Sequence, residues 1–119
     1  MNTSKLREND VLYVNEVISY LQERELDVEL AGSALKGDRK YKDVDLLARG
    51  SSEAVTDATS GLAGFCVRTE PFPKRAADGL EYNVRHVSGP KMYVGNTIDE
   101  RFKIEVGQTK IDLCLQIKK

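Results

Sequence analysis

The sequence predicts an α+β domain with a mixed sheet and helices on one face of it. In the first half of the chain, apolar residues at helical spacing alternate with short apolar runs that end at turn residues. In the second half, short segments of alternating apolar and polar residues follow one another. The first pattern predicts helices that cover a sheet, and the second predicts an antiparallel C-terminal meander.

Two helices are expected in the first half. Apolar residues recur at helical spacing from residue 10 to about residue 25, and Asn9 or Asp10 is available as the N-cap. The second helix is expected to begin after Ser51 or Ser52 and to end near Leu62.

The expected strands are short, because turn residues interrupt the apolar segments. Pro71 and Pro73 end one segment, and Gly107 separates the last two. The last four strands form the predicted meander. The expected strands are residues 28–31, 43–48, 65–69, 82–87, 91–94, 102–106 and 111–117.

Length and charge limit the expected functions. With 119 residues the chain is expected to form one domain, residues 1–119, without a second domain that selects the substrate. The formal net charge of −1 argues against a broad basic surface for nucleic acid, although a local basic patch remains compatible with it.

The sequence also bears on location and on the cysteines. No apolar segment approaches the roughly 20 residues that a membrane-spanning helix needs, and no signal-peptide core follows the N-terminus, so we expect a cytoplasmic protein without membrane contact. Cys66 and Cys114 lie in apolar, strand-like segments and are expected to pack as free thiols. Together with the single His86 they lack the spacing of a zinc site.

Residues 30–47 contain most of the candidate chemistry. An apolar run ends at Gly32-Ser33, where glycine allows a tight turn and a close approach of a phosphate to the backbone. A second apolar run carries Asp43 and Asp45, which project from one face of a strand because they are two residues apart. Adjacent carboxylates repel each other unless a cation lies between them, so the spacing predicts a Mg²⁺ site.

This arrangement resembles the signature of the DNA polymerase β-like nucleotidyltransferase superfamily, in which a Gly-Ser turn precedes an Asp-x-Asp strand. Nine residues separate Gly32-Ser33 from Asp43-Val44-Asp45. The short chain is most similar to minimal nucleotidyltransferases, some of which are antitoxin partners of small helical toxins. The resemblance implies a nucleotidyltransferase-like sheet and a role as a single minimal nucleotidyltransferase domain.

Members of this superfamily carry a third acidic residue on a later strand. Asp112 lies between Ile111 and Leu113, and Glu105 is the competing candidate on the preceding strand. We favour Asp112, because its strand is longer and more apolar and is therefore expected to be central and next to the first two carboxylates.

The resemblance also implies a reaction. Two Mg²⁺ ions at Asp43, Asp45 and Asp112, the implied catalytic residues, would bind a nucleoside triphosphate, and a nucleoside monophosphate would pass to a hydroxyl of a protein, an RNA or a small molecule. Asp112 would act on the acceptor side, as the base or by placing the metal. The residues implied in nucleotide binding are Gly32, Ser33, Lys36 and Arg39.

The chain departs from the family pattern in several places. Lys36 stands where minimal members have an arginine, and Lys42 stands where they have a serine before the first aspartate. The spacing from Arg39 to the aspartates is similar to that of abortive-infection nucleotidyltransferases, but Tyr41 replaces their small hydroxyl residue. Active members usually carry a helical domain that binds the base and the acceptor, and we expect none after Asp112. The alternative is therefore a non-catalytic binding module, such as an antitoxin-like partner of a small helical protein, or a homodimer.

Each candidate residue also has a plain structural interpretation. Asp43 and Asp45 could begin a solvated strand beside Lys40 and Lys42, in weak exposed ion pairs. Asp112 could face solvent opposite Lys110. The basic residues 38–42 could form a solvated loop, and Tyr41 could pack against the domain instead of stacking on a base.

Overall fold

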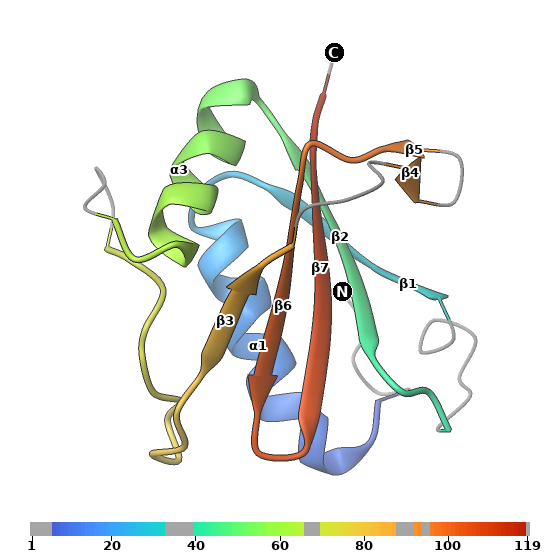
Figure 1. The fold of residues 1–119 in the computed structure, drawn as a ribbon, viewed down its shortest axis with the longest axis vertical. Helices are drawn as coiled ribbons and strands as arrows, with labels where there is room; N and C mark the ends of the chain where they lie inside the picture. Colours follow the sequence, from blue (N-terminus) through green and yellow to red (C-terminus); the bar gives the residue numbers. More distant parts are fainter. Residues whose placement is uncertain (1–5, 33–39, 66–69, 88–91, 94–95, 119) are drawn as a thin grey trace.

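The sheet and its helices form two layers (Figure 1). The computed structural model describes residues 6–32, 40–65, 70–87, 92–93 and 96–118. In this part of the chain, both helices pack on one face of a five-stranded sheet. The elements are α1 (Glu8–Gln22), β1 (Asp27–Ala31), β2 (Val44–Gly50), α3 (Ser52–Leu62), β3 (Asn83–His86), β4 (Met92–Tyr93), β5 (Asn96–Thr97), β6 (Glu100–Val106) and β7 (Thr109–Ile117).

The strand order of the main sheet is β1-β2-β7-β6-β3. β2 and β7 are parallel, and every other neighbouring pair is antiparallel. This mixed sheet confirms the predicted α+β class. The predicted meander is only partly correct: β3, β6 and β7 form it, but β4 pairs with β5 in a separate two-stranded sheet.

Helix α1 begins earlier than the capping pattern predicts. It starts at Glu8, and Arg7 is the N-cap residue without a side-chain cap bond, so the prediction of Asn9 or Asp10 as the cap is wrong. The Asp10 carboxylate accepts hydrogen bonds from other parts of the fold and is not used as a cap. The helix ends at Gln22, and Glu25 turns the chain with a φ of 64°.

Helix α3 agrees with its prediction. Ser51 is the N-cap, and its hydroxyl accepts a hydrogen bond from the Ala54 N–H at 3.1 Å. Val55, Ala58 and Leu62 form the buried side of the helix. This spacing of three and four residues places them on one helical face.

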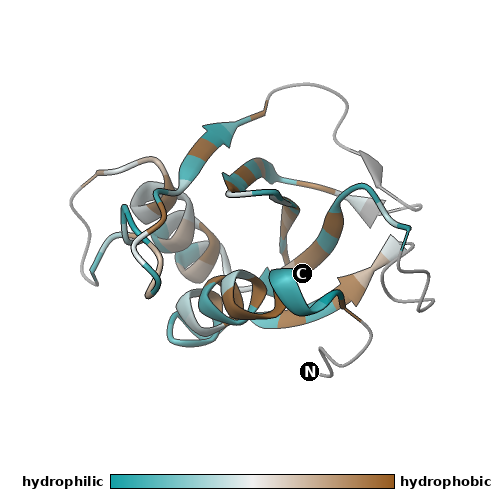
Figure 2. Cartoon of the chain, turned by 90° about the horizontal axis from the view of Figure 1, so that it is seen from below, coloured by the Kyte–Doolittle hydropathy of each residue, from teal (hydrophilic) through white to brown (hydrophobic). Residues whose placement is uncertain are grey.

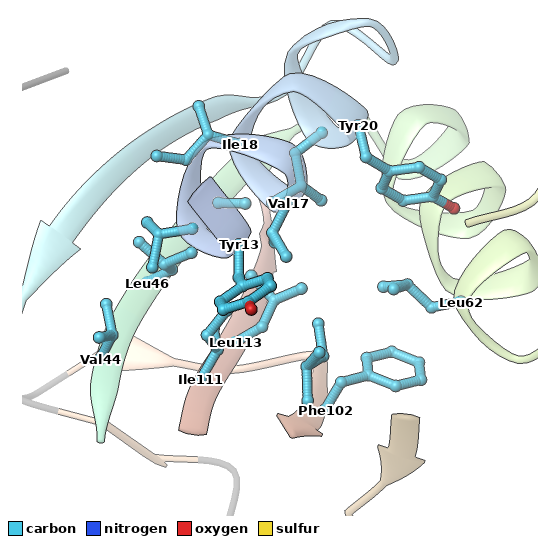
Figure 3. Packing of buried hydrophobic residues seen from close by; sticks show 14 of the residues in the cluster. Tyr13, Val17, Ile18, Tyr20, Val44, Leu46, Leu62, Phe102, Ile111 and Leu113 are labelled. Carbon is cyan, nitrogen blue, oxygen red and sulfur yellow. The ribbon is translucent and has the colours of Figure 1, made fainter. Parts of the chain in front are cut away.

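The main core lies between the helices and the sheet (Figure 3). Val17 of α1 faces Leu46 of β2 and Leu113 of β7, and all three are buried. Phe102 on β6 closes the core below Leu62 of α3. Hydrophobic and hydrophilic bands alternate along the strands (Figure 2), as expected for a sheet with only one face covered by helices.

The segment after α3 differs from its prediction. A strand was expected over residues 65–69, but Phe65 is 68% exposed and belongs to no strand, and residues 66–69 lie outside the described residues. The chain then returns to the core at Phe72. The Phe72 ring lies 5.2 Å from that of Tyr20 and 4.7 Å from that of Tyr82, measured between centroids.

Candidate functional site

Two of the predicted carboxylates lie side by side on adjacent strands. The register of the parallel strands β2 and β7 pairs Asp45 with Asp112. Neighbouring strands are about 4.8 Å apart, so the two side chains leave the sheet from adjacent positions. Leu46 and Leu113, which follow them, pack in the core under the helices. Alternation therefore directs both carboxylates to the opposite face, which we call the open face.

The strand order separates the two candidates for the third carboxylate. Asp112 is on β7, directly beside β2, whereas Glu105 is on β6, one strand further away. Glu105 is exposed and pairs in register with Lys110. β7 is the central strand of the sheet, as predicted from its length and apolar composition, and of the two acids it is Asp112 that adjoins Asp45.

A basic side chain that the sequence analysis did not single out binds Asp112. Arg101 on β6 donates from Nε to Oδ1 of Asp112 at 2.9 Å and from Nη2 to Oδ2 at 2.6 Å. The Asp112 side chain is 9% exposed, so water screens this charge-assisted pair only weakly. The hydrogen bonds to Asp112 raise the pKa of Arg101 above its usual value, and the charge of Asp45 adds to the effect.

The turn between β6 and β7 predicts part of this contact. A two-residue connection, Gly107-Gln108, fixes the register of the hairpin. Counting back from it places Lys103 opposite Asp112 and Arg101 two residues further along the same face. The turn therefore predicts two cations near Asp112. Which of them binds the carboxylate depends on side-chain conformation, which the sequence pattern does not contain.

The predicted phosphate turn begins next to Asp45. Ala31, the last residue of β1, pairs in register with Asp45, and Gly32 follows with a φ of 65°. Glycine adopts such a backbone without strain because it has no Cβ. The other three predicted nucleotide-binding residues, Ser33, Lys36 and Arg39, lie outside the described residues.

The carboxylates fit a hard cation in chemistry, because Mg²⁺ prefers carboxylate oxygens. Asp43 directly precedes β2 and is partly exposed. In the part of the chain that the structure describes, no three His, Cys, Asp or Glu side chains are grouped so that they could hold one metal ion. A cation at Asp43 and Asp45 would therefore need further oxygens from water or a ligand. The charge of Asp112 beside them is balanced by Arg101.

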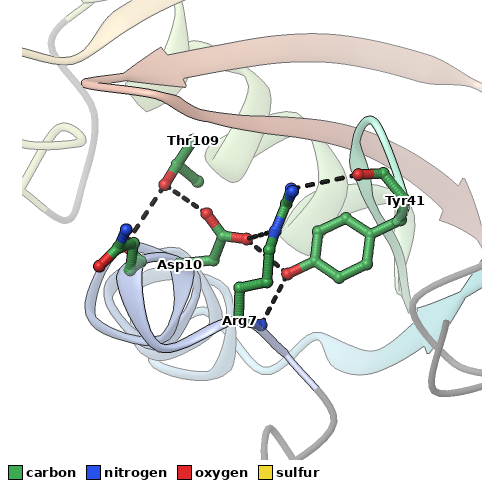
Figure 4. A network of polar contacts seen from close by, with 5 residues as sticks. Arg7, Asp10, Tyr41 and Thr109 are labelled. Carbon is green, nitrogen blue, oxygen red and sulfur yellow. Dashed lines mark hydrogen bonds and ion pairs between the residues drawn. The ribbon is translucent and has the colours of Figure 1, made fainter. Parts of the chain in front are cut away.

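Tyr41 lies in a buried polar network that the sequence analysis missed (Figure 4). Its hydroxyl donates to the Asp10 carboxylate and accepts a hydrogen bond from the Arg7 N–H at 2.9 Å. The Arg7 guanidinium lies over the Tyr41 ring, 4.2 Å from its centroid. The Thr109 hydroxyl donates to the second Asp10 oxygen at 2.6 Å.

This network determines what Tyr41 does in the protein. Its side chain is 4% exposed, so it packs against the domain and is not available to stack on a base. The contacts join the starts of α1 and β7 to a residue two positions before Asp43. The network therefore holds the chain where it enters β2. No sequence signal links positions 10, 41 and 109, because the contacts exist only after folding.

Cys114 lies on the open face, two residues beyond Asp112. It packs with Leu47 and Ile98 in a small cluster and is 2% exposed. Burial raises the pKa of the thiol to about 11, so it stays protonated at neutral pH and is a poor nucleophile. Cys114 is thus a small core residue, as predicted, while Cys66 lies outside the described residues.

His86 lies on the face that the helices cover. Its ring stacks on Phe102 with 4.7 Å between centroids, and its Nε2 is 2.5 Å from Oε2 of Glu100. The register pairs His86 with Phe102, which is a residue of the main core. His86 is therefore separated by the sheet from Asp45 and Asp112.

A hollow of about 1010 Å³ lies between α1, the end of α3 and the segment that leads to β3. Tyr20, Phe72 and Tyr82 form its apolar wall, and the buried Arg24 also lines it. None of the predicted site residues lines it. The hollow is thus separate from the carboxylate pair.

The comparisons with known proteins identify no relative. No family model matches the chain, and no curated protein or solved structure matches it. In the described ranges, neither helix is long and apolar enough to cross a membrane. The functional argument therefore rests on the residues and contacts of this chain.

Proposed function

We propose that the chain is a nucleotidyltransferase domain that binds a nucleoside triphosphate with Mg²⁺ and transfers a nucleoside monophosphate to a hydroxyl group. The observation that carries the proposal is the pairing of Asp45 with Asp112 across two parallel strands of the open face. The position of Gly32 supports it, because the predicted phosphate turn begins at this residue and Ala31 before it pairs with Asp45. A carboxylate pair beside the predicted turn would combine a cation site with a place for phosphate.

Each predicted residue has a role in the proposed reaction. Asp43 and Asp45 would hold Mg²⁺, which when bound supplies positive charge to the phosphate oxygens. Backbone N–H groups of the turn at Gly32 would bind the β- and γ-phosphates, as backbone concavities do. Asp112 would accept a hydrogen bond from the acceptor hydroxyl and take its proton. The side chains assigned to the triphosphate are Ser33, Lys36 and Arg39.

Arg101 sets the condition under which Asp112 acts. The Arg101 guanidinium donates to both oxygens of Asp112 and so competes with an acceptor hydroxyl for them. An acceptor hydroxyl must therefore share Asp112 with Arg101 or draw Arg101 away from it. The proposed role of Asp112 as proton acceptor therefore depends on which other groups bind near Arg101.

The same ion pair favours a second candidate function, a non-catalytic binding module. If the Arg101–Asp112 pair is purely structural, Asp112 cannot serve as the third catalytic carboxylate beside Asp43 and Asp45. Such a module would act through a partner, for example a small helical protein or a second copy of the chain. β1 and β3 are the edges of the main sheet, and an edge strand offers backbone groups for pairing with another chain.

A calorimetric titration with ATP and Mg²⁺ tests the proposal. The wild type is expected to bind, and the combined variant Asp43→Asn/Asp45→Asn is expected to bind at least tenfold more weakly. The control variant Glu8→Gln/Glu81→Gln also removes two exposed carboxylates, but from α1 and from the segment before β3, so it should bind as the wild type does. Absence of a binding heat in the folded wild type would contradict the proposal.

The variant Asp112→Asn distinguishes the two candidate functions. If Asp112 takes the acceptor proton, the variant binds Mg²⁺ and ATP normally but releases pyrophosphate more slowly. If Asp112 serves only the ion pair with Arg101, the variant lowers the melting temperature, and the wild type itself releases no pyrophosphate above background.

A further inference from the structure

Four charged residues form a row across the open face. The register pairs Asp45 with Asp112, Asp112 with Lys103, and Lys103 with Arg85. The row thus crosses β2, β7, β6 and β3, which lie side by side in Figure 1. Because it begins at the carboxylate pair, its cationic half lies where an acceptor would approach Asp112.

The two cations of the row have no partner in the described part of the chain. Lys103 lies opposite Asp112, but Asp112 is bound by Arg101, and neither Lys103 nor Arg85 has a hydrogen bond or ion pair there. Residues directly opposite on antiparallel strands have Cβ atoms about 5 Å apart, and like charges at such positions destabilise a sheet. A bound anion between Lys103 and Arg85 would remove this repulsion.

Charge changes sign across the open face. On the β1 and β2 side, the face carries three acids, of which Glu29 pairs with Arg49 at 3.6 Å and Asp27 pairs with Lys118. On the β6 and β3 side it carries three cations, with Glu105 in the next row beside Lys110. The acids are Asp27, Glu29 and Asp45, and the cations are Arg101, Lys103 and Arg85. The basic half therefore suits an anionic acceptor.

We propose that the acceptor is a single-stranded nucleic acid whose phosphate backbone lies across Lys103 and Arg85, with its terminal hydroxyl at Asp112. The proposal rests on the proposed function, because it names the acceptor for that site. In the reaction the hydroxyl oxygen forms a bond to the α-phosphorus of the nucleotide. The bond from this phosphorus to the bridging oxygen breaks, pyrophosphate leaves with the electron pair, and the hydroxyl proton passes to Asp112 and then to water.

The two neighbouring cations favour a nucleic acid as the acceptor over a protein side chain or a neutral small molecule. A nucleic acid strand carries one phosphate per nucleotide, so adjacent phosphates can meet Arg85 and Lys103 in turn. The basic half covers only two strands, which is narrow for a duplex but sufficient for a single strand that follows a short cationic track. With two phosphate contacts, the logarithm of the binding constant should fall with the logarithm of salt concentration with a slope of about −1.4.

Fluorescence anisotropy with a labelled ten-nucleotide single-stranded RNA, without nucleotide or Mg²⁺, tests the proposal. At low salt the wild type should bind the RNA, and Arg85→Gln/Lys103→Gln should bind it at least fivefold more weakly. In this variant the slope of the logarithm of the binding constant against the logarithm of salt concentration should be closer to zero by about 1.4. Arg85→Lys/Lys103→Arg keeps both charges and should keep binding. Lys74→Gln/Arg75→Gln removes two exposed cations from the segment before β3 and should also bind as the wild type does.

Two results would overturn the proposal. One is an absence of RNA binding by the folded wild type at low salt. The other is an equal affinity of the wild type and Arg85→Gln/Lys103→Gln, or an equal loss in the Lys74→Gln/Arg75→Gln control. Calorimetry with Mg²⁺ and ATP on the same proteins separates the two proposals, since the loss of Arg85 and Lys103 should leave nucleotide binding unchanged.

Discussion

Asp10 shows how a single residue can join distant parts of this fold. Its side chain is 5% exposed, yet the carboxylate has a cation and two hydroxyl donors around it. A buried charge is tolerated only when such partners replace water. The Arg7 guanidinium, 3.2 Å away through Nε, balances the charge, while Tyr41 and Thr109 satisfy the two oxygens.

The contact between Asp10 and Tyr41 should be measurable by a double-mutant cycle. Tyr41→Phe removes the hydroxyl and leaves an Asp10 oxygen and the Arg7 N–H short of a partner, so we expect a loss of about 1–3 kcal/mol in the free energy of unfolding. Asp10→Asn should cost a similar amount. Because the residues share the contact, the double variant should lose less than the sum, with a coupling of at least about 0.5 kcal/mol in urea denaturation. Strict additivity would show that the two side chains act independently.

At the scale of elements, the crossing of α1 and α3 depends on a missing side chain. The Tyr20 hydroxyl of α1 donates to the Ala58 carbonyl of α3 at 2.9 Å. Gly61, also in α3, lies so close that a Cβ at this position would overlap the Tyr20 hydroxyl and come within 3.3 Å of its Cζ. The glycine allows the two helices to approach at this point.

Gly61→Ala is therefore expected to destabilise the protein, although alanine has a higher helix propensity than glycine by about 1 kcal/mol. Crowding against Tyr20 should outweigh this gain and give a net loss of about 1–2 kcal/mol in the free energy of unfolding. Tyr20→Phe removes the overlapping oxygen, so Gly61→Ala should be less harmful in the Tyr20→Phe background. An equal loss in both backgrounds, measured by thermal or urea denaturation, would exclude the proposed contact as the cause.

For the whole molecule, buried groups that keep their protons determine how the free energy of unfolding changes at alkaline pH. Burial raises the pKa of Cys114 to about 11 and that of Tyr20 to about 12. In the unfolded chain a thiol titrates near pH 8.5 and a phenol near pH 10. The unfolded state therefore releases these protons first, so the free energy of unfolding falls as the pH rises above about 8.5.

Cys114→Ala should remove part of this pH dependence. The shifted pKa of Cys114 contributes about 3 kcal/mol to the free energy of unfolding. This contribution is fully present below about pH 8.5 and is lost as the pH rises toward 11. The variant is expected to be less stable than the wild type at pH 8, because it loses packing against Leu47 and Ile98. The gap should narrow by about 2–3 kcal/mol between pH 8 and pH 11 in urea denaturation. A gap that stays constant over this range would contradict the assignment.

The sequence by itself determined the class of fold, the position of both helices and most of the strands. It did so because periodicity and turn residues are local: Ser51 caps its helix, and Gly107-Gln108 sets the hairpin of β6 and β7. The length and apolar composition of β7 also predicted that this strand lies beside β2, which brings Asp112 next to Asp45.

Only the tertiary structure decided which charges meet on the open face. Arg101 takes both oxygens of Asp112, while Lys103, the register partner of Asp112, remains without a described partner. Asp10 becomes the centre of a buried network instead of a helix cap. These outcomes depend on side-chain reach and on contacts between distant segments. A sequence pattern places residues on a face, but it does not determine which neighbour a long side chain binds.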